Sequence, residues 1–448
     1  MKPIVLTYLL LTSLFGATSI TQYGTTVTFA ADETVGQYAN GDYWVLDDGN
    51  VIINSWTPTT DASGSSRIKN GVMVNPTAGI DPSQGFDSSL GNYSEALNVG
   101  NDWPRTIVSG ETLLKAVSVE EAGARPQFTD IVILTVVSSV PSSGDFRPPY
   151  VGTDKTLWSG KNKSDLDYTI LKSLAQPNGG TNVPSLASVE ALIDRSWIEI
   201  HTSVGGREWH PTNHQQYYGR EINYDLNEIM LSLQLDYTNI QKENLYIGLV
   251  QYGLDIYAAL NMGATWPAKG GHNHGRKLPM LIAGNALNIS AIITAANSST
   301  VFQEDLQTFY VTQADIDLCP KYSDDGRDRE CYTQEMMGMP EWGAQHDEQP
   351  IRDGSNWDIE YRQTVGAGII GEVLTAQIME FKTAWGHNAI FDYADRFWEI
   401  EEVNRADALN QIHLFEADMW DAYRYLLASS TSRKTSSFSG SIRGIAVP

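Results

Sequence analysis

Residues 206–276 contain two polar clusters that flank two stretches with helical spacing. The first cluster reads GREWHPTNHQQYYGR (206–220) and the second reads GGHNHGR (270–276). Between them, INYDLNEIMLSL (222–233) and LYIGLVQYGLDIYAA (245–259) place apolar residues three and four positions apart, as one face of an α-helix requires. A pair of such helices would carry both clusters to the same end.

These two clusters are more polar than a segment that forms part of a hydrophobic core. Aromatic, amide and arginine side chains are interspersed there, whereas a hydrophobic core at the same density would use Leu and Val. Such crowding of titratable and hydrogen-bonding groups is typical of a functional site. Of the 8 histidines in the chain, five lie in this region or just before it: His201, His210, His214, His272 and His274.

The first third of the chain has a different pattern, that of short β-strands. Runs of β-branched and aromatic residues alternate with Gly, Asn, Ser and Pro, which predicts an antiparallel, β-sandwich-like domain over residues 32–155. The loop at 145–154 contains two adjacent prolines and marks the end of this domain. The strands are expected at residues 43–46, 51–53, 71–74, 113–117 and 131–137.

Residues 156–448 are expected to form a second, all-α domain, so the chain as a whole is predicted to be an α+β multidomain protein. Helical spacing continues after the two helices above. Residues 310–360 interrupt it with a polar, Gly- and Pro-containing stretch that is long enough to be a functional loop. The further helices are expected at 278–296, 365–381, 388–398 and 417–427.

The N-terminus has the pattern of a secretory signal peptide, which we place at residues 1–31. Lys2 precedes an apolar run at 4–15 that is too short to span a bilayer, and cleavage is expected either after Ser19 or near Ala30. No later stretch is long and apolar enough for a membrane helix. We therefore expect a secreted or periplasmic protein.

Cys319 and Cys331 are the only two cysteines of the chain. In an oxidising compartment they would form a disulfide, and closing a loop of that length stabilises a protein by roughly 3 kcal/mol. Two free buried thiols are the alternative.

Composition excludes some classes of function. The chain has 448 residues with 42% hydrophobic content, which fits a globular protein of more than one domain. Its 30 Lys and Arg against 54 Asp and Glu give a net charge of −24, so nucleic acid is not an expected partner. Residues 201–280 carry six basic and seven acidic residues. The predicted site is therefore less acidic than the rest of the chain and suits an anionic ligand.

The residue types in the two clusters are those that β-elimination from a uronate requires. The reaction needs donors that neutralise the uronate carboxylate, a base for the C5 proton and an acid for the departing oxygen. We expect Asn213 and His214 to neutralise the carboxylate and Arg276 to bind it in a bidentate way. The residues that could move the protons are Tyr217, Tyr218, Tyr361, His272 and His274.

His272 and His274 also have a spacing that occurs in metal sites. Nearby carboxylates are sparse in the sequence, and no thiol is close. Asn273 and Arg276 beside them favour contact with an anion instead. We therefore expect neither a metal ion nor another cofactor.

The Asn213-His214 pair followed by aromatic residues resembles the Asn-Asn-His motif of alginate-lyase-type polysaccharide lyases with an (α/α)-toroid fold, with Thr212 in the place of the first Asn. The segments HNHGRKLP (272–279) and WGHNAIFDYADR (385–396) are similar to stretches of secreted toroid proteins. The resemblance covers roughly residues 185–400. It implies a toroid or partial toroid, and a lyase that acts on an acidic polysaccharide such as alginate or a related uronan.

Two other functions stay open. An inverting glycoside hydrolase on a similar toroid needs two carboxylates roughly 6.5–9.5 Å apart, and residues 341–360 contain several Asp and Glu. A non-catalytic glycan-binding surface protein would use the same aromatic side chains. Contacts to an acidic polysaccharide are expected from Arg207, Trp209, His210, Arg220, Asn273, Lys277, Trp342, His346 and Arg362.

Overall fold

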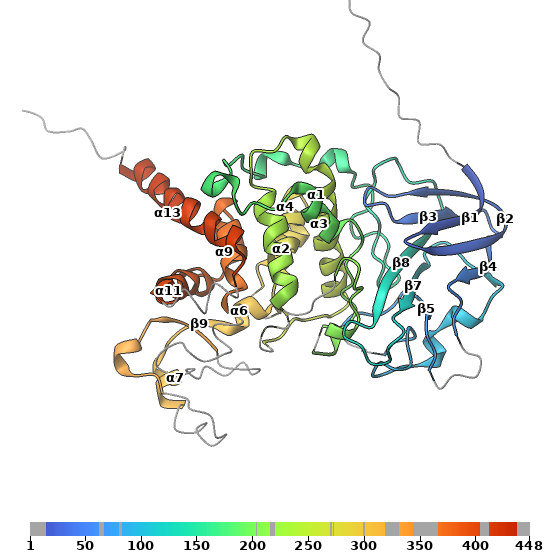
Figure 1. Ribbon diagram of the computed structural model, residues 1–448, viewed down its shortest axis with the longest axis horizontal. Helices are drawn as coiled ribbons and strands as arrows, with labels where there is room; N and C mark the ends of the chain where they lie inside the picture. Colours follow the sequence, from blue (N-terminus) through green and yellow to red (C-terminus); the bar gives the residue numbers. More distant parts are fainter. Residues whose placement is uncertain are drawn as a thin grey trace, which may run out of the picture.

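The chain folds into a curled β-sheet at one end and a group of helices that fills the rest of the molecule (Figure 1). The predicted α+β class is therefore confirmed. The computed structural model describes residues 15–61, 67–79, 83–202, 204–215, 220–268, 271, 273–298, 301–318, 331–343, 366–403 and 412–436.

The sheet follows the order β5-β7-β8-β3-β2-β4-β6, and β1 pairs with β2 beside that path. All five predicted strands are present, and β3 coincides with the predicted residues 43–46. The strands are β1 (Phe15–Gln22), β2 (Thr25–Gln37), β3 (Tyr43–Leu46), β4 (Ile52–Thr57), β5 (Val72–Val74), β6 (Arg105–Thr106), β7 (Thr112–Ser118) and β8 (Phe128–Val137).

The prediction of a purely antiparallel sandwich was wrong in one respect, because the strands form one mixed sheet. β3 runs parallel to β8, with Tyr43 opposite Leu134, while the other pairs are antiparallel. Parallel neighbours need a long connection between them. Here the chain from β3 to β8 passes through four other strands before it returns, and the spacing of apolar residues does not reveal that route.

The two faces of this sheet pack in two different hydrophobic cores. Neighbouring residues of β7 and β8 point to opposite faces and are therefore buried in different cores. Leu113 and Leu134 pack in a cluster inside the curled sheet. Their neighbours Leu114 and Ile133 point to the other face and belong to the large cluster that continues into the helices. The sheet is thus covered by helices on one face and by its own curl on the other.

The predicted helices are present, with one correction. The expected helix at 278–296 is two helices, α4 (Lys277–Ala286) and α5 (Ser290–Ala296). Asn288 takes a left-handed conformation between them, with φ of +51°, and Ile289 N donates back to Gly284 O at 2.8 Å.

The remaining helices either overlap the predicted ones with different bounds, as where the helix expected at 365–381 spans only Ile369–Ile378, or were not predicted. They are α1 (Leu186–Ile193), α2 (Arg220–Ser232), α3 (Asn239–Asn261), α6 (Gln303–Gln307), α7 (Gln313–Leu318), α9 (Ile369–Ile378), α10 (Lys382–Trp385), α11 (Ala389–Val403) and α13 (Leu414–Ser436). A short antiparallel pair joins β9 (Thr308–Tyr310) to β10 (Pro340–Trp342). None of the helices in the described part of the chain has the length and apolarity to cross a membrane.

Helix α3 forms the centre of the helical half and sets the position of α4. A capping box begins it, since Thr238 and Gln241 bind each other's backbone N–H groups. Further along, Gly253 lies against α4 so closely that a Cβ there would be 2.2 Å from the carbonyl oxygen of Pro279. The two helices can pack at this distance only because Gly253 has no side chain.

The loop at 145–154, predicted as a domain boundary, is packed between the sheet and the helices. The buried Arg147 side chain binds Asp42 beside the sheet, with Nε to Oδ2 at 2.6 Å, and Asp255 on α3. Trp158 Nε1 donates to the carbonyl oxygen of Arg147 at 2.8 Å. The loop is therefore a packed connection between the sheet and the helices.

Residues 15–31, which we place in the signal peptide, lie in β1 and in the first half of β2. Ile20, Val27 and Phe29 are buried in the core inside the curled sheet. Cleavage near Ala30 would remove all three. The sequence pattern of a leader and that of an apolar strand pair overlap here.

We expect a chain that begins at residue 32 to be less stable than one that begins at residue 15. Burial of three apolar side chains contributes on the order of 5 kcal/mol, so the midpoint of urea unfolding should fall well below that of the longer chain. Equal midpoints would mean that β1 and the start of β2 are dispensable, as expected of a cleaved leader.

Candidate functional site

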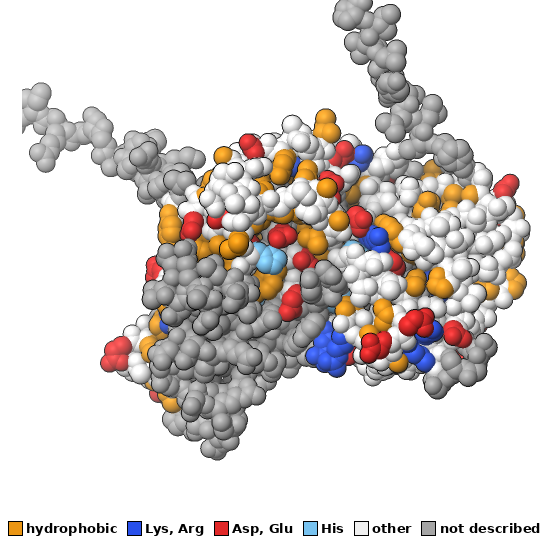
Figure 2. Space-filling model, viewed as in Figure 1, with side chains coloured by type: hydrophobic (Ala, Val, Ile, Leu, Met, Phe, Trp, Pro, Cys, Tyr) orange, Lys and Arg blue, Asp and Glu red, His pale blue; other side chains and the backbone are white. Residues whose placement is uncertain are grey.

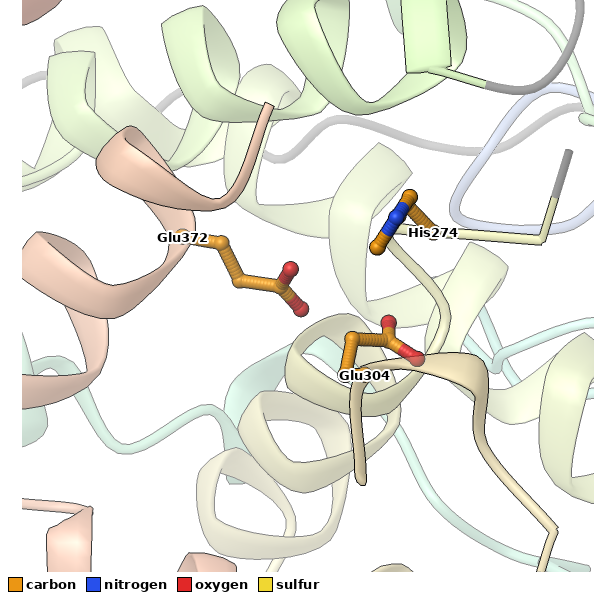
Figure 3. Close-up of side chains that lie close together, drawn as sticks. All are labelled: His274, Glu304 and Glu372. Atoms are coloured by element: carbon orange, nitrogen blue, oxygen red, sulfur yellow. The ribbon is translucent and has the colours of Figure 1, made fainter. Parts of the chain in front are cut away.

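Three side chains that can bind a cation converge inside the helical half. His274 comes from the segment before α4, Glu304 from α6 and Glu372 from α9. One possible ligand atom from each lies within 4.8 Å of those of the other two, and all three side chains are fully buried. Figure 3 shows the Glu372 carboxylate pointing toward Glu304, whose carboxylate lies below the imidazole of His274.

The main chain around His274 is fixed by Glu304. Its Oε1 accepts hydrogen bonds from the backbone N–H groups of Gly275 and Arg276, at 2.9 and 3.1 Å. Gly275 has φ of +83°, and a Cβ there would lie 2.7 Å from Asn223 Oδ1. Only glycine fits this turn, which brings His274 back over α6.

Glu372 is positioned by close packing of α9 against α2. Gly371 lets the helices approach, since a Cβ there would be 2.6 Å from the Asn227 side chain. Asn223 Nδ2 and Asn227 Nδ2 both donate to the carbonyl oxygen of Gly368, at 2.6 and 2.8 Å. Asn223 Nδ2 also lies 3.4 Å from Glu372 Oε2.

Each of the two carboxylates therefore has one oxygen engaged and one oxygen without a hydrogen bond. Glu304 Oε2 and Glu372 Oε1 are buried and have no hydrogen-bond partner. Burial raises the pKa of Glu304, and it raises the pKa of Glu372 well above its usual range with the Glu304 charge as a further cause. Two carboxylates so placed are stable only with a proton or a cation between them.

The ring of His274 is held from two sides. It stacks on the indole of Trp342 with the ring centroids 5.1 Å apart, and its Nε2 lies 2.9 Å from the Gln303 amide nitrogen. Trp342, expected to contact sugar, is itself buried, so in this structure it supports His274.

Arg276, expected to bind a substrate carboxylate, instead forms an internal ion pair. Its Nη2 lies 2.8 Å from Glu199 Oε1, and both side chains are buried. Tyr252 and Trp266 donate to the same Glu199 carboxylate, at 2.9 and 3.3 Å. The Arg276 guanidinium also binds the carbonyl oxygen of His274, so this pair anchors the segment that carries the site.

The structure places Asn213 and His214 in other contacts. Asn213 Nδ2 donates to Asp130 Oδ2 of β8 at 2.6 Å. His214 is buried and its Nε2 donates to the carbonyl oxygen of Ser196 at 3.1 Å. Both residues thus make hydrogen bonds within the protein, Asn213 to the sheet and His214 to the segment after α1. The pair expected to neutralise a substrate carboxylate is therefore occupied by structural contacts.

Other predicted contact residues are also engaged within the protein. His210 is buried, and Trp209 packs edge-on against Phe86 with centroids 6.1 Å apart. Asn273 donates to the carbonyl oxygen of Pro267 at 2.8 Å, and the fully buried Lys277 pairs with Asp305. Arg207 is half-buried at the end of a short 3-10 turn.

Several predictions lie outside the described residues and stay predictions. Cys331 is described but Cys319 is not, so the disulfide is among them. Arg220 begins α2, but its side chain is not described. The others are Tyr217, Tyr218, His272, His346, Tyr361 and Arg362.

Reasoning from the sequence missed Glu199, Glu304 and Glu372. One local signal was available, because Glu372 is the only charged residue in the apolar run IIGEVLTAQI of α9. A charge in such a run is rarely buried unless it has a partner. Glu199 lies among Trp197, Ile198 and Ile200 and offers a similar signal, whereas Glu304 has polar neighbours and offers none.

Polar side chains also gather at the surface of the helical half. Figure 2 shows a His and several acidic side chains in the middle of the displayed face. A cavity of about 250 Å³ lies elsewhere, between the end of β8 and the loop at 141–160, and its lining includes Tyr38, Lys155 and Trp158. The candidate site is therefore the buried cluster of His274, Glu304 and Glu372, which we call the His–Glu cluster.

Comparisons of the chain with protein-family models, with curated proteins and with solved structures found no match.

Replacing Arg276 by Ala should destabilise the fold. The change leaves the Glu199 carboxylate buried without its ion-pair partner, which costs roughly 3–5 kcal/mol of unfolding free energy in urea titration. A Glu199→Gln, Arg276→Met double variant should recover part of this loss, since it buries no unpaired charge. An Arg276→Ala variant as stable as the wild type would show that Arg276 is available to a ligand.

The free energy of unfolding should fall as the pH drops from about 6.5 toward 4. Burial lowers the pKa of His214 to about 3 and that of His210 to about 4. Between these values and the usual value near ~6.5, the unfolded chain binds more protons than the folded one. His214→Gln should therefore reduce the slope of stability against pH in this range.

His413 offers a control with the opposite sign. Its hydrogen bond to Glu228, at 2.8 Å, raises the pKa of His413 to about 9. Its stabilisation is complete below about 6.5 and is lost as the pH rises through about 9. His413→Gln should alter the alkaline side of the profile, and an unchanged acid slope in His214→Gln would contradict the assignment.

Proposed function

We propose that this protein is a polysaccharide lyase that cleaves a uronate-containing acidic polysaccharide by β-elimination, with the His–Glu cluster as its reaction centre. One observation carries the proposal. His274, a predicted catalytic residue, meets two carboxylates that come from separate helices, within 4.8 Å. A centre of this kind, away from bulk water, suits proton transfer beside a developing negative charge.

The helical half supports this proposal in a general way. Helices α3 and α4, α2 and α9, and α9 and α13 pack against one another in pairs. A partial (α/α) toroid, as in the alginate-lyase-type enzymes that the sequence resembles, is part of the same proposal. So is export of the protein, since its substrate is an extracellular polymer.

The reaction requires positive charge or strong hydrogen-bond donors at the uronate carboxylate. The residues expected to supply them hold other partners: Arg276 binds Glu199, and Asn213 binds Asp130. His214 is neutral at pH 7, because burial lowers its pKa to about 3. In this proposal the donor or positive charge lies at the His–Glu cluster, as the proton or cation that Glu304 and Glu372 require between them.

An inverting glycoside hydrolase fits the cluster less well. Its two carboxylates would have to leave room for a water molecule at roughly 6.5–9.5 Å. The Glu304 and Glu372 oxygens approach within 4.8 Å. Glu341, another candidate acid, is buried and lies 3.4 Å from Arg396.

The test is incubation with alginate and related uronans while absorbance in the near ultraviolet is followed, because a lyase product carries a new C=C bond. His274→Ala should lower the initial rate by about 100-fold or more, the scale for loss of a preorganised group. Glu416→Gln is the matched control, since Glu416 is a fully buried carboxylate on α13 outside the cluster.

New reducing ends without near-ultraviolet absorbance would identify a hydrolase instead. Binding of the polymer without any product would identify a glycan-binding protein. Full activity in His274→Ala, or an equal loss in Glu416→Gln, would remove the His–Glu cluster from the reaction.

A further inference from the structure

We propose that the His–Glu cluster binds one divalent transition-metal ion through His274, Glu304 and Glu372. The inference deepens the proposed function and rests on it only for the role of the ion, since binding itself is independent of any substrate. Two observations point to it: the convergence of three ligand side chains, and the two buried carboxylate oxygens without a hydrogen bond.

The carboxylates are arranged as metal ligands usually are, with one oxygen fixed by the protein and the other oxygen left to coordinate. Glu304 uses Oε1 to accept from the backbone N–H groups of Gly275 and Arg276, and its Oε2 is left over. Glu372 uses Oε2 toward Asn223, and its Oε1 is left over. Both leftover oxygens belong to side chains that point into the space shared with His274 (Figure 3).

Among the described residues, the two cationic side chains that follow His274 in the sequence are committed to other acids. Arg276 pairs with Glu199, and Lys277 pairs with Asp305. Trp385 adds a hydrogen bond to Asp305 at 2.8 Å, which completes that second pair. Two buried carboxylates beside these satisfied pairs still carry charge that needs compensation, and a divalent cation supplies it in full.

The donor set indicates which class of ion would bind. One imidazole nitrogen and two carboxylate oxygens suit Zn²⁺, Mn²⁺ or Fe²⁺, whereas Ca²⁺ prefers six or more oxygens. The stacking of Trp342 orients the His274 ring.

In the proposed reaction, this ion provides the positive charge that the substrate carboxylate requires. It also ties together the segment before α4, helix α6 and helix α9, which are distant in the sequence. The competing arrangement is a single proton shared by Glu304 and Glu372, which explains their raised pKa values without a metal.

The experiment is metal binding by the full chain, without substrate. Protein stripped with a chelator is titrated with Zn²⁺ and separately with Mn²⁺. The bound metal is counted by elemental analysis after gel filtration, and the melting temperature is recorded at each concentration. We expect about one equivalent of ion per chain and a melting temperature that rises with the free metal concentration.

Glu372→Gln and His274→Ala remove one ligand each and should weaken binding by at least roughly 10-fold to 100-fold. Glu416→Gln should bind as the wild type does, because it changes an equally buried carboxylate that lies outside the cluster. Circular dichroism of each variant confirms that it is folded. If one cluster variant does not fold, Glu304→Gln replaces it.

Failure of the wild-type chain to retain the ion, or equal binding by all the variants, would overturn the metal site and leave the shared proton. A chain that binds the ion but forms no unsaturated product would retain the metal site and lose the lyase proposal. A chelated, metal-free chain that still forms unsaturated product at the full rate would retain the lyase, and would overturn the role of the ion in the reaction but not the binding site.

Discussion

The buried ion pair between Glu199 and Arg276 is the interaction on which the candidate site depends most. Glu199 lies in the chain between α1 and α2, and its backbone N–H donates to the Tyr150 hydroxyl at 2.6 Å. Its carboxylate accepts from Tyr252, Trp266 and Arg276. Through Arg276, this one acid fixes the segment that presents His274.

A second buried ion pair also fixes the positions of distant segments, and here a central cation is bound by acids. Arg147 is a buried cation between two acids, Asp42 and Asp255, which belong to opposite halves of the molecule. Charges this deep are costly unless they are fully paired, so each of these clusters allows very little freedom in how its segments sit. We infer that such pairs specify one arrangement of sheet and helices among the many that would bury similar apolar area.

Local patterns in the sequence predicted elements well and contacts poorly. Strands β3, β7 and β8 and helices α2 and α3 were recognisable because apolar residues recur with the period of one buried face. The parallel pairing of β3 with β8 and the turn at Asn288 depend on contacts and backbone angles that no period encodes. The leader-like N-terminus was ambiguous, because an apolar strand and a signal peptide use the same residues.

Only part of the candidate site was predicted, because the sequence does not show which distant residues come together. His274 stood out because histidine is rare in this chain and clustered there. Glu304 is one of many acidic residues in a chain of −24 charge, and only its position in space distinguishes it, whereas Glu372 also stands out as the one charge in its apolar helix. Arg276 was assigned to a ligand because its partner, Glu199, lies far away in the sequence.

The shared core on the helix-facing side of the sheet limits how this protein could have been assembled in evolution. Leu114 and Ile133 of the sheet pack in the same cluster as the helices, so the helical half ends in a large apolar surface if the sheet is taken away. The sheet therefore differs from an appended carbohydrate-binding module, which folds alone and can be gained or lost. Shuffling of the helical part into another architecture would require a substitute sheet with a matching apolar face.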